Sequence, residues 1–185
     1  MKEVEKYSTE VHNQIIGWTE NCDTKASIIL AFVGVLVSVT FTSEYLLSGI
    51  EMEIKNIISY WNDNVGSFSF ISALMFIALI GFVILMAQCC YFALLSLKAN
   101  VDCSDNSIIF FDKIVESSKE NYIENVNEIT DDEYKRDKLS QIYNCAKICS
   151  TKFCNYNKSV RLLSFGMSCF VCFILFVIIL KALCI

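Results

Sequence analysis

The chain has 185 residues, which suits one domain or a small membrane protein, and 55% hydrophobic residues with a mean hydropathy of +0.48 favour the second. The formal net charge of −5 argues against a nucleic-acid polymer as partner, because such partners require a basic patch. The first residues mix acids with lysines and lack the short apolar core of a signal peptide.

Residues 1–25 predict a cytosolic amphipathic helix. Its a/d heptad seam consists of Val4, Ser8, Val11, Ile15, Trp18 and Cys22. Such a narrow seam needs a partner helix to cover it. The single histidine, His12, is expected on the polar side, in contact with solvent. No proline or glycine separates Trp18 from the next apolar stretch, so we expect one continuous helix.

Charged residues avoid three segments, 26–43, 64–97 and 162–180. A membrane-spanning helix needs about 20 mostly apolar residues. The sequence therefore predicts transmembrane helices over 26–48, 64–97 and 161–185. The first is short, so we expect it to include 45–47, beyond Glu44.

An outer interfacial segment is predicted over 49–63. One helical face of this segment carries Ile50, Ile54, Ile57, Ile58 and Trp61, with charged and polar residues elsewhere. Such a helix can lie flat on a membrane surface. A plain connector is the alternative.

A cytosolic helical domain is predicted over 98–160, opening with a turn at 100–106 and a helix at about 107–126. Thr130 and Glu133 form a capping box, which starts the next helix. That helix is predicted from 131 to 183, about 80 Å long at 1.5 Å per residue. A stripe beginning at Leu139 and Ile142 follows it into the third span. The predicted fold is an all-α membrane protein with three transmembrane helices and cytosolic helical extensions that form a bundle.

The lysines and arginines predict the orientation, because cytosolic loops carry an excess of them. Residues 1–25 contain three, 44–63 contain only Lys55, and 98–161 contain ten. We therefore expect the N-terminus and the long loop in the cytosol, and the first loop and the C-terminus outside. The ten cysteines are expected to be reduced and to serve as small apolar side chains.

Three places in the chain resemble one known family. The first is Trp18 followed by Asp23-x-Lys25-Ala26 at the start of the first span. The second is the segment 109–114, Ile-Phe-Phe-Asp-Lys-Ile, after the second span. The third is Gln141-Ile142-Tyr143-x-x-Ala146-Lys147-Ile148-x-x-x-Lys152, which runs toward the third span. In this order the motifs resemble the Pycsar effector transmembrane family, bacterial antiphage proteins that respond to cyclic pyrimidine mononucleotides.

The chain departs from the family after the second span, where Asn100-Val101-Asp102 replaces a basic turn. The resemblance implies an inner-membrane effector of a cyclic-nucleotide antiphage defence system. It implies gating by a cyclic pyrimidine mononucleotide (cCMP or cUMP) and abortive infection through impaired membrane integrity. Unpartnered seams predict a homo-oligomer, and the other expected partner is the lipid membrane.

The residues admit two interpretations of the polar groups near the first span. Asp23 and Lys25 are two apart on a helix and cannot face each other. Either Asp23 pairs with a basic residue of the helix at 131–183 while Lys25 reaches lipid headgroups, or both contact the ligand. Lys147, Lys152, Lys158 and Arg161 likewise suit either anionic lipid or an anion pocket. The candidate ligand-binding residues are Trp18, Asp23, Lys25, Phe111, Tyr143, Lys147 and Lys152.

The sequence contains no glycine-rich phosphate loop, metal signature or nucleophile–base pair. It predicts no catalytic residues, no metal and no cofactor, and therefore no enzyme. Two other classes stay open. A small oligomeric ion-channel subunit would need polar residues facing a lumen, and a membrane scaffold for a soluble partner would need an exposed cytosolic stripe.

Overall fold

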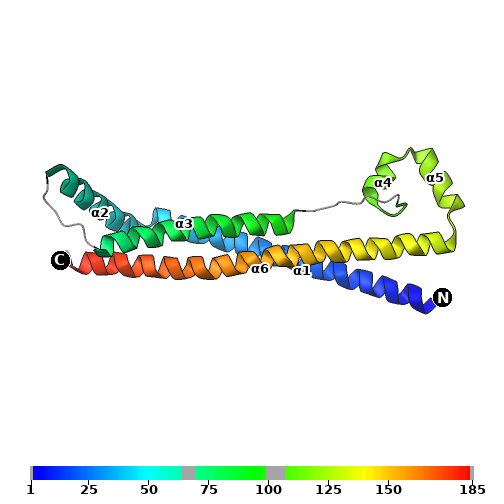
Figure 1. Ribbon diagram of the computed structural model, residues 1–185, viewed down its shortest axis with the longest axis horizontal. Helices are drawn as coiled ribbons and strands as arrows, with labels where there is room; N and C mark the ends of the chain where they lie inside the picture. The colour runs from blue at the N-terminus through cyan, green and yellow to red at the C-terminus, as the bar shows by residue number, and fades with distance from the viewer. Residues whose placement is uncertain (1, 64–69, 99–106, 184–185) are drawn as a thin grey trace. The chain divides into compact units, whose positions relative to one another are not determined.

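The computed structural model describes residues 2–63, 70–98 and 107–183, and the side chains among them except those of 2–4 and 62–63. These residues form α1 (Lys2–Thr42), α2 (Glu44–Asp63), α3 (Phe70–Leu97), α4 (Phe111–Glu116), α5 (Lys119–Glu128) and α6 (Asp131–Leu183), with no strand among them (Figure 1). Three helices, α1, α3 and α6, are long and apolar enough to cross a membrane. The predicted all-α membrane fold is confirmed.

The helices contribute to two compact units. Unit 1 consists of residues 1–24 and 96–154, and unit 2 of residues 25–95 and 155–185. The long helices α1 and α6 supply residues to both units. The predicted continuity of the N-terminal helix with the first span is confirmed, because α1 runs without interruption from Lys2 to Thr42.

Unit 2 has an apolar core in which α3 lies alongside α6 (Figure 1). Phe82 and Phe170 stack with ring centroids 5.0 Å apart, and Phe82, Phe173 and Met75 are fully buried. Near residue 155, where the α6 part of unit 2 begins, α3 and α6 also form a polar contact. The Ser159 hydroxyl donates a hydrogen bond to the Cys89 carbonyl at 3.1 Å. Small polar groups of this kind let transmembrane helices approach closely.

The first span is shorter than predicted. α1 ends at Thr42 and α2 begins at Glu44, so the expected continuation through 45–47 is wrong: these residues belong to α2. The Thr40 and Thr42 hydroxyls donate to carbonyls four residues earlier, and threonine is a weak helix former. The acidic Glu44 favours a new helix N-terminus because it complements the helix dipole.

The interfacial segment forms a longer helix than predicted. Leu46, Gly49 and Glu53 lie on the side of α2 that packs against the rest of unit 2, and all three are buried. Ile54, Ile58 and Trp61, which the sequence assigned to its main apolar face, stay exposed. The sequence missed the packed face because a glycine and a glutamate interrupt its apolar pattern.

The single helix predicted at about 107–126 is wrong. It is divided into α4 and α5, which meet at Ser117 and Ser118. The Ser118 hydroxyl accepts a hydrogen bond from the Asn121 backbone N–H and caps α5. Serine competes with the helical backbone in this way and so favours caps over helix interiors. The turn predicted at 100–106 lies outside the described residues.

The predicted capping box is confirmed. The Thr130 backbone N–H and hydroxyl donate to the Glu133 carboxylate at 3.0 and 2.7 Å, and the Glu133 N–H donates to the Thr130 hydroxyl at 3.4 Å. α6 begins one residue after Thr130 and extends over 53 residues to Leu183, as predicted. Leu139 is an exception to its expected stripe, because its side chain is exposed.

The seam predicted on α1 is partly correct. Ser8, Ile15 and Cys22 are buried, but Trp18 is 55% exposed and lies off the seam. The neighbouring Thr19 is half-buried instead. His12 was expected in solvent, and this expectation is also wrong: it is half-buried, and its Nδ1 is buried without a hydrogen-bond partner.

Candidate functional site

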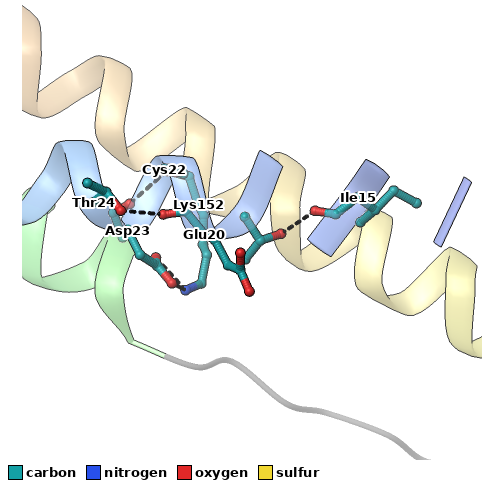
Figure 2. Close-up of polar contacts among 8 residues, drawn as sticks. Ile15, Glu20, Cys22, Asp23, Thr24 and Lys152 are labelled. Atoms are coloured by element: carbon teal, nitrogen blue, oxygen red, sulfur yellow. Dashed lines mark hydrogen bonds and ion pairs between the residues drawn. The ribbon is translucent and has the colours of Figure 1, made fainter. Parts of the chain in front are cut away.

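The strongest polar contact in unit 1 joins α1 to α6. The Lys152 ammonium donates to both carboxylate oxygens of Asp23, at 2.6 and 2.8 Å. Figure 2 shows the two groups facing each other across the helices. The Lys152 side chain is 9% exposed and the Asp23 side chain 37% exposed. The predicted pairing of Asp23 with a basic residue of α6 is thus confirmed, whereas the contact of Lys25 with lipid headgroups stays a prediction.

The Ser96 hydroxyl of α3 contacts both α6, at the same turn, and α1. The Ser96 hydroxyl donates to the Lys152 backbone carbonyl at 3.2 Å, and the Cys22 thiol lies 3.4 Å from the Ser96 oxygen. Because the serine proton is used, the thiol is the donor to Ser96. Cys22 and Ser96 are fully buried. We call Cys22, Asp23, Ser96 and Lys152 the polar node; it connects three helices in unit 1.

The polar node has two electrostatic consequences. A lysine that is almost fully buried requires a counter-charge, since an isolated ammonium in a poorly hydrated site is strongly destabilising. Removing Asp23 alone therefore leaves Lys152 with an unfavourable charge, whereas removing both groups is milder. The pair is also a contact that an anion could replace, because a phosphate oxygen can accept the same ammonium protons.

The other candidate ligand-binding residues are accessible to solvent. Lys25 and Lys147 are exposed, and Lys25 belongs to unit 2. Trp18 is more than half exposed and Tyr143 is 70% exposed. Phe111 packs beside the buried Phe110, with ring centroids 4.8 Å apart, and keeps one open face.

Lys158 and Arg161 are the other two basic residues that the sequence groups with Lys147 and Lys152. The Lys158 ammonium lies over the Phe92 ring, 5.3 Å from its centroid. Arg161 is exposed. Both lie in unit 2, close to the apolar part of α6. Their placement fits basic residues beside a membrane boundary.

An open cavity of about 750 Å³ lies between α4, α5 and the first turns of α6, and no pattern in the sequence predicts it. Its lining contains one lysine, Lys113, which pairs with Glu116 at 2.7 Å. Three further carboxylates line it, from Glu128, Glu133 and Asp137. This charge distribution disfavours an anionic phosphate. The spacing of the acidic residues in the sequence could not predict this cavity, because the cavity is formed by the turn between α4 and α5.

Within the ranges that the structure describes, no three side chains of histidine, cysteine, aspartate or glutamate are placed to hold a metal ion. Seven of the cysteines in these ranges are free thiols: Cys22, Cys89, Cys90, Cys149, Cys154, Cys169 and Cys172. Cys22, Cys89 and Cys149 are buried, as small apolar residues would be.

Comparison with known proteins identifies the family. The Pycsar effector protein domain matches residues 7–180. The chain is 30% identical over 167 residues to the Pycsar effector protein GmPycTM of Gulbenkiania mobilis, covering 86% of this chain and 85% of that protein. No solved structure matches. The chain therefore belongs to the Pycsar effector transmembrane family and is a membrane effector of antiphage defence.

Proposed function

We propose that this protein is gated by a cyclic pyrimidine mononucleotide, cCMP or cUMP, and then impairs the integrity of the bacterial inner membrane, which aborts infection. Family membership supports the defence role, and the polar node supports the gating. In this proposal the N-terminus faces the cytosol, where the nucleotide is produced, and the chain works as a homo-oligomer in the lipid bilayer.

The observation that carries the gating proposal is the Asp23–Lys152 ion pair. The phosphate of the nucleotide competes with the Asp23 carboxylate for the Lys152 ammonium. When the phosphate wins, α1 loses its strongest polar contact with α6. A ligand shifts such an equilibrium only by binding one state more tightly, and this competition supplies the difference in affinity.

The remaining candidates have roles that follow from their chemistry. Lys25 and Lys147 are exposed cations that attract the anionic ligand. Trp18, Tyr143 and Phe111 are exposed aromatic rings, and a pyrimidine base stacks on such a ring. The acidic cavity at α4 and α5 has no part in phosphate binding, because its net charge is negative.

Calorimetry on the full chain in detergent tests this proposal. We expect cCMP or cUMP to bind to the wild type, and Lys152→Met to abolish binding. Asp23→Asn should tighten binding several-fold, because the neutral amide competes less well for Lys152 and raises the fraction of binding-competent protein. Purine cyclic nucleotides should bind more weakly.

The matched control is Lys138→Met. Lys138 also joins α6 to α1, through a hydrogen bond to the Thr9 hydroxyl at 2.9 Å, and it forms no ion pair with any side chain that the structure describes. This variant should bind like the wild type. Weaker binding in Asp23→Asn would give the ion pair a purely structural role. Absence of binding by the wild type would contradict direct sensing and favour a channel subunit or a scaffold for a soluble partner.

A further inference from the structure

Besides the packing of Leu46 in the apolar core, three contacts join helix α2 to α3 and α6 within unit 2. They are the close approach of Gly49 to Val177, the hydrogen bonds of Lys181 to Tyr45 and Ser48, and the hydrogen bond between Ser72 and Glu53. We call these seven residues the α2 clamp. It lies at the far end of unit 2 from the basic residues Lys158 and Arg161.

The close approach depends on the missing side chain of Gly49. A Cβ atom at this position would lie 2.7 Å from Cγ1 of Val177 on α6. Valine is stiff about χ1, so it could not move aside without shifting a helix. Gly49 therefore allows α2 to approach α6 more closely than any other residue would.

The Lys181 side chain is fully engaged by α2. Its ammonium donates to the Tyr45 carbonyl at 2.7 Å and to the Ser48 hydroxyl at 2.6 Å, and lies 3.8 Å from the Tyr45 ring centroid. A lysine in the last turn of a transmembrane helix would otherwise reach lipid phosphates. Here the backbone of α2 takes the place of the headgroup.

Glu53 is the least expected member of the clamp. It is 3% exposed and accepts a hydrogen bond from the Ser72 hydroxyl, and Ser72 is 1% exposed. An ionisable side chain buried beside a membrane span is costly, and such residues are typically functional. Glu53 regains water as soon as α2 moves away.

Lys181 and Glu53 thus each have an alternative partner outside the clamp, which is lipid phosphate for Lys181 and water for Glu53. The opposite side of α2 is already apolar, with Ile54, Ile58 and an 81% exposed Trp61. This face can rest on lipid whether the clamp is closed or open. Release of α2 therefore exchanges its polar contacts for lipid phosphate and water, and gives up the packing of Leu46 and Gly49.

We propose that α2 is a releasable clamp that holds the ends of α3 and α6 together, and that its release loosens the packing of these two spans. Closed, it restrains the bundle; open, it leaves α2 held to the lipid surface by its exposed apolar face alone. Only the consequence for membrane leakage rests on the proposed function; the docking of α2 does not.

Hydrogen–deuterium exchange of the full chain in lipid nanodiscs tests the clamp directly. In Lys181→Met and in Ser72→Ala, the amides of α2 should exchange about tenfold faster than in the wild type, which corresponds to about 1.4 kcal/mol. Lys181→Arg should restore slow exchange, since it keeps a cation that can donate to Tyr45 and Ser48. Dye leakage from vesicles without nucleotide should rise in the same two variants.

Lys55→Met and Glu51→Gln are the matched controls, because both side chains are exposed on the same helix. Their exchange and leakage should equal those of the wild type. Unchanged α2 exchange in Lys181→Met and Ser72→Ala would overturn the clamp. Faster exchange without any leakage would retain the clamp as a docking contact and contradict its consequence for membrane integrity. Loss of nucleotide binding is a separate result that leaves exchange unaffected.

Discussion

Individual residues in this protein are constrained by how closely helices approach. Gly49 and Gly34 illustrate the contrast, because both are glycines inside long helices. A Cβ at Gly49 would clash with Val177, whereas a Cβ at Gly34 would meet no atom within 4 Å. The same residue type is therefore required at one position and replaceable at the other.

We predict opposite effects for the two alanine substitutions. Gly49→Ala should lower the free energy of unfolding by about 1–3 kcal/mol through overpacking. Gly34→Ala should leave it unchanged or raise it by up to about 1 kcal/mol, because alanine is the better helix former. Thermal unfolding in detergent measures both. Equal shifts in the same direction would show that Val177 accommodates the new methyl group.

A second prediction at this scale concerns the ion pair in the polar node. Asp23→Asn should destabilise the protein by about 2 kcal/mol, between the values for surface and buried pairs, because Asp23 is 37% exposed. Adding Lys152→Met should recover part of that loss by removing the buried charge. A double-mutant cycle of unfolding free energies measures the coupling. Additive effects would mean that the two charges do not interact.

At the scale of the element, α6 begins with a chemically specified cap. The Thr130 backbone N–H, and after it the Thr130 hydroxyl, hold the pKa of Glu133 below its usual value by donating to its carboxylate. A carboxyl whose pKa is lowered on folding stabilises the protein above its ordinary pKa. That contribution is lost as the pH falls through the lowered value.

The cap therefore predicts a pH-dependent difference between two proteins. Glu133→Ala should melt below the wild type at neutral pH, and the difference in melting temperature should shrink as the solution is acidified. Thermal unfolding of both across acid pH measures this. Glu116→Ala is the control, because its carboxylate has no role in a cap. A difference that stays constant with pH would show that the Glu133 charge is not involved.

At the scale of the whole molecule, three apolar helices and the distribution of basic residues determine the expected topology. An odd number of spans places the two termini on opposite sides of the membrane. We predict that alkaline phosphatase fused after Ile185 is active in bacteria, whereas the same fusion before Met1 is inactive. Fusions to green fluorescent protein should give the reverse pattern. Activity at both ends would require an even number of spans.

Much of the fold was predictable because it depends on local rules. The absence of proline, the Thr130–Glu133 cap and long uncharged stretches specify α1 and α6 along the chain itself. The break at Ser117 and Ser118 was missed, because serine is tolerated inside helices and acts as a cap only when the following turn places an N–H within reach.

The sequence by itself determined the all-α class, the number of apolar helices and the family, since these follow from composition, periodicity and motif order. Only the tertiary structure decided which side chains meet. From the sequence, several lysines could pair with Asp23, and the structure shows that Lys152 does. On α1, Thr19 is half-buried at the seam and Trp18 is exposed. No pattern in the sequence predicted that Glu53 and Gly49 pack against α3 and α6. The physical reason is that pairing across helices depends on rotation and relative depth, which a one-dimensional pattern leaves open.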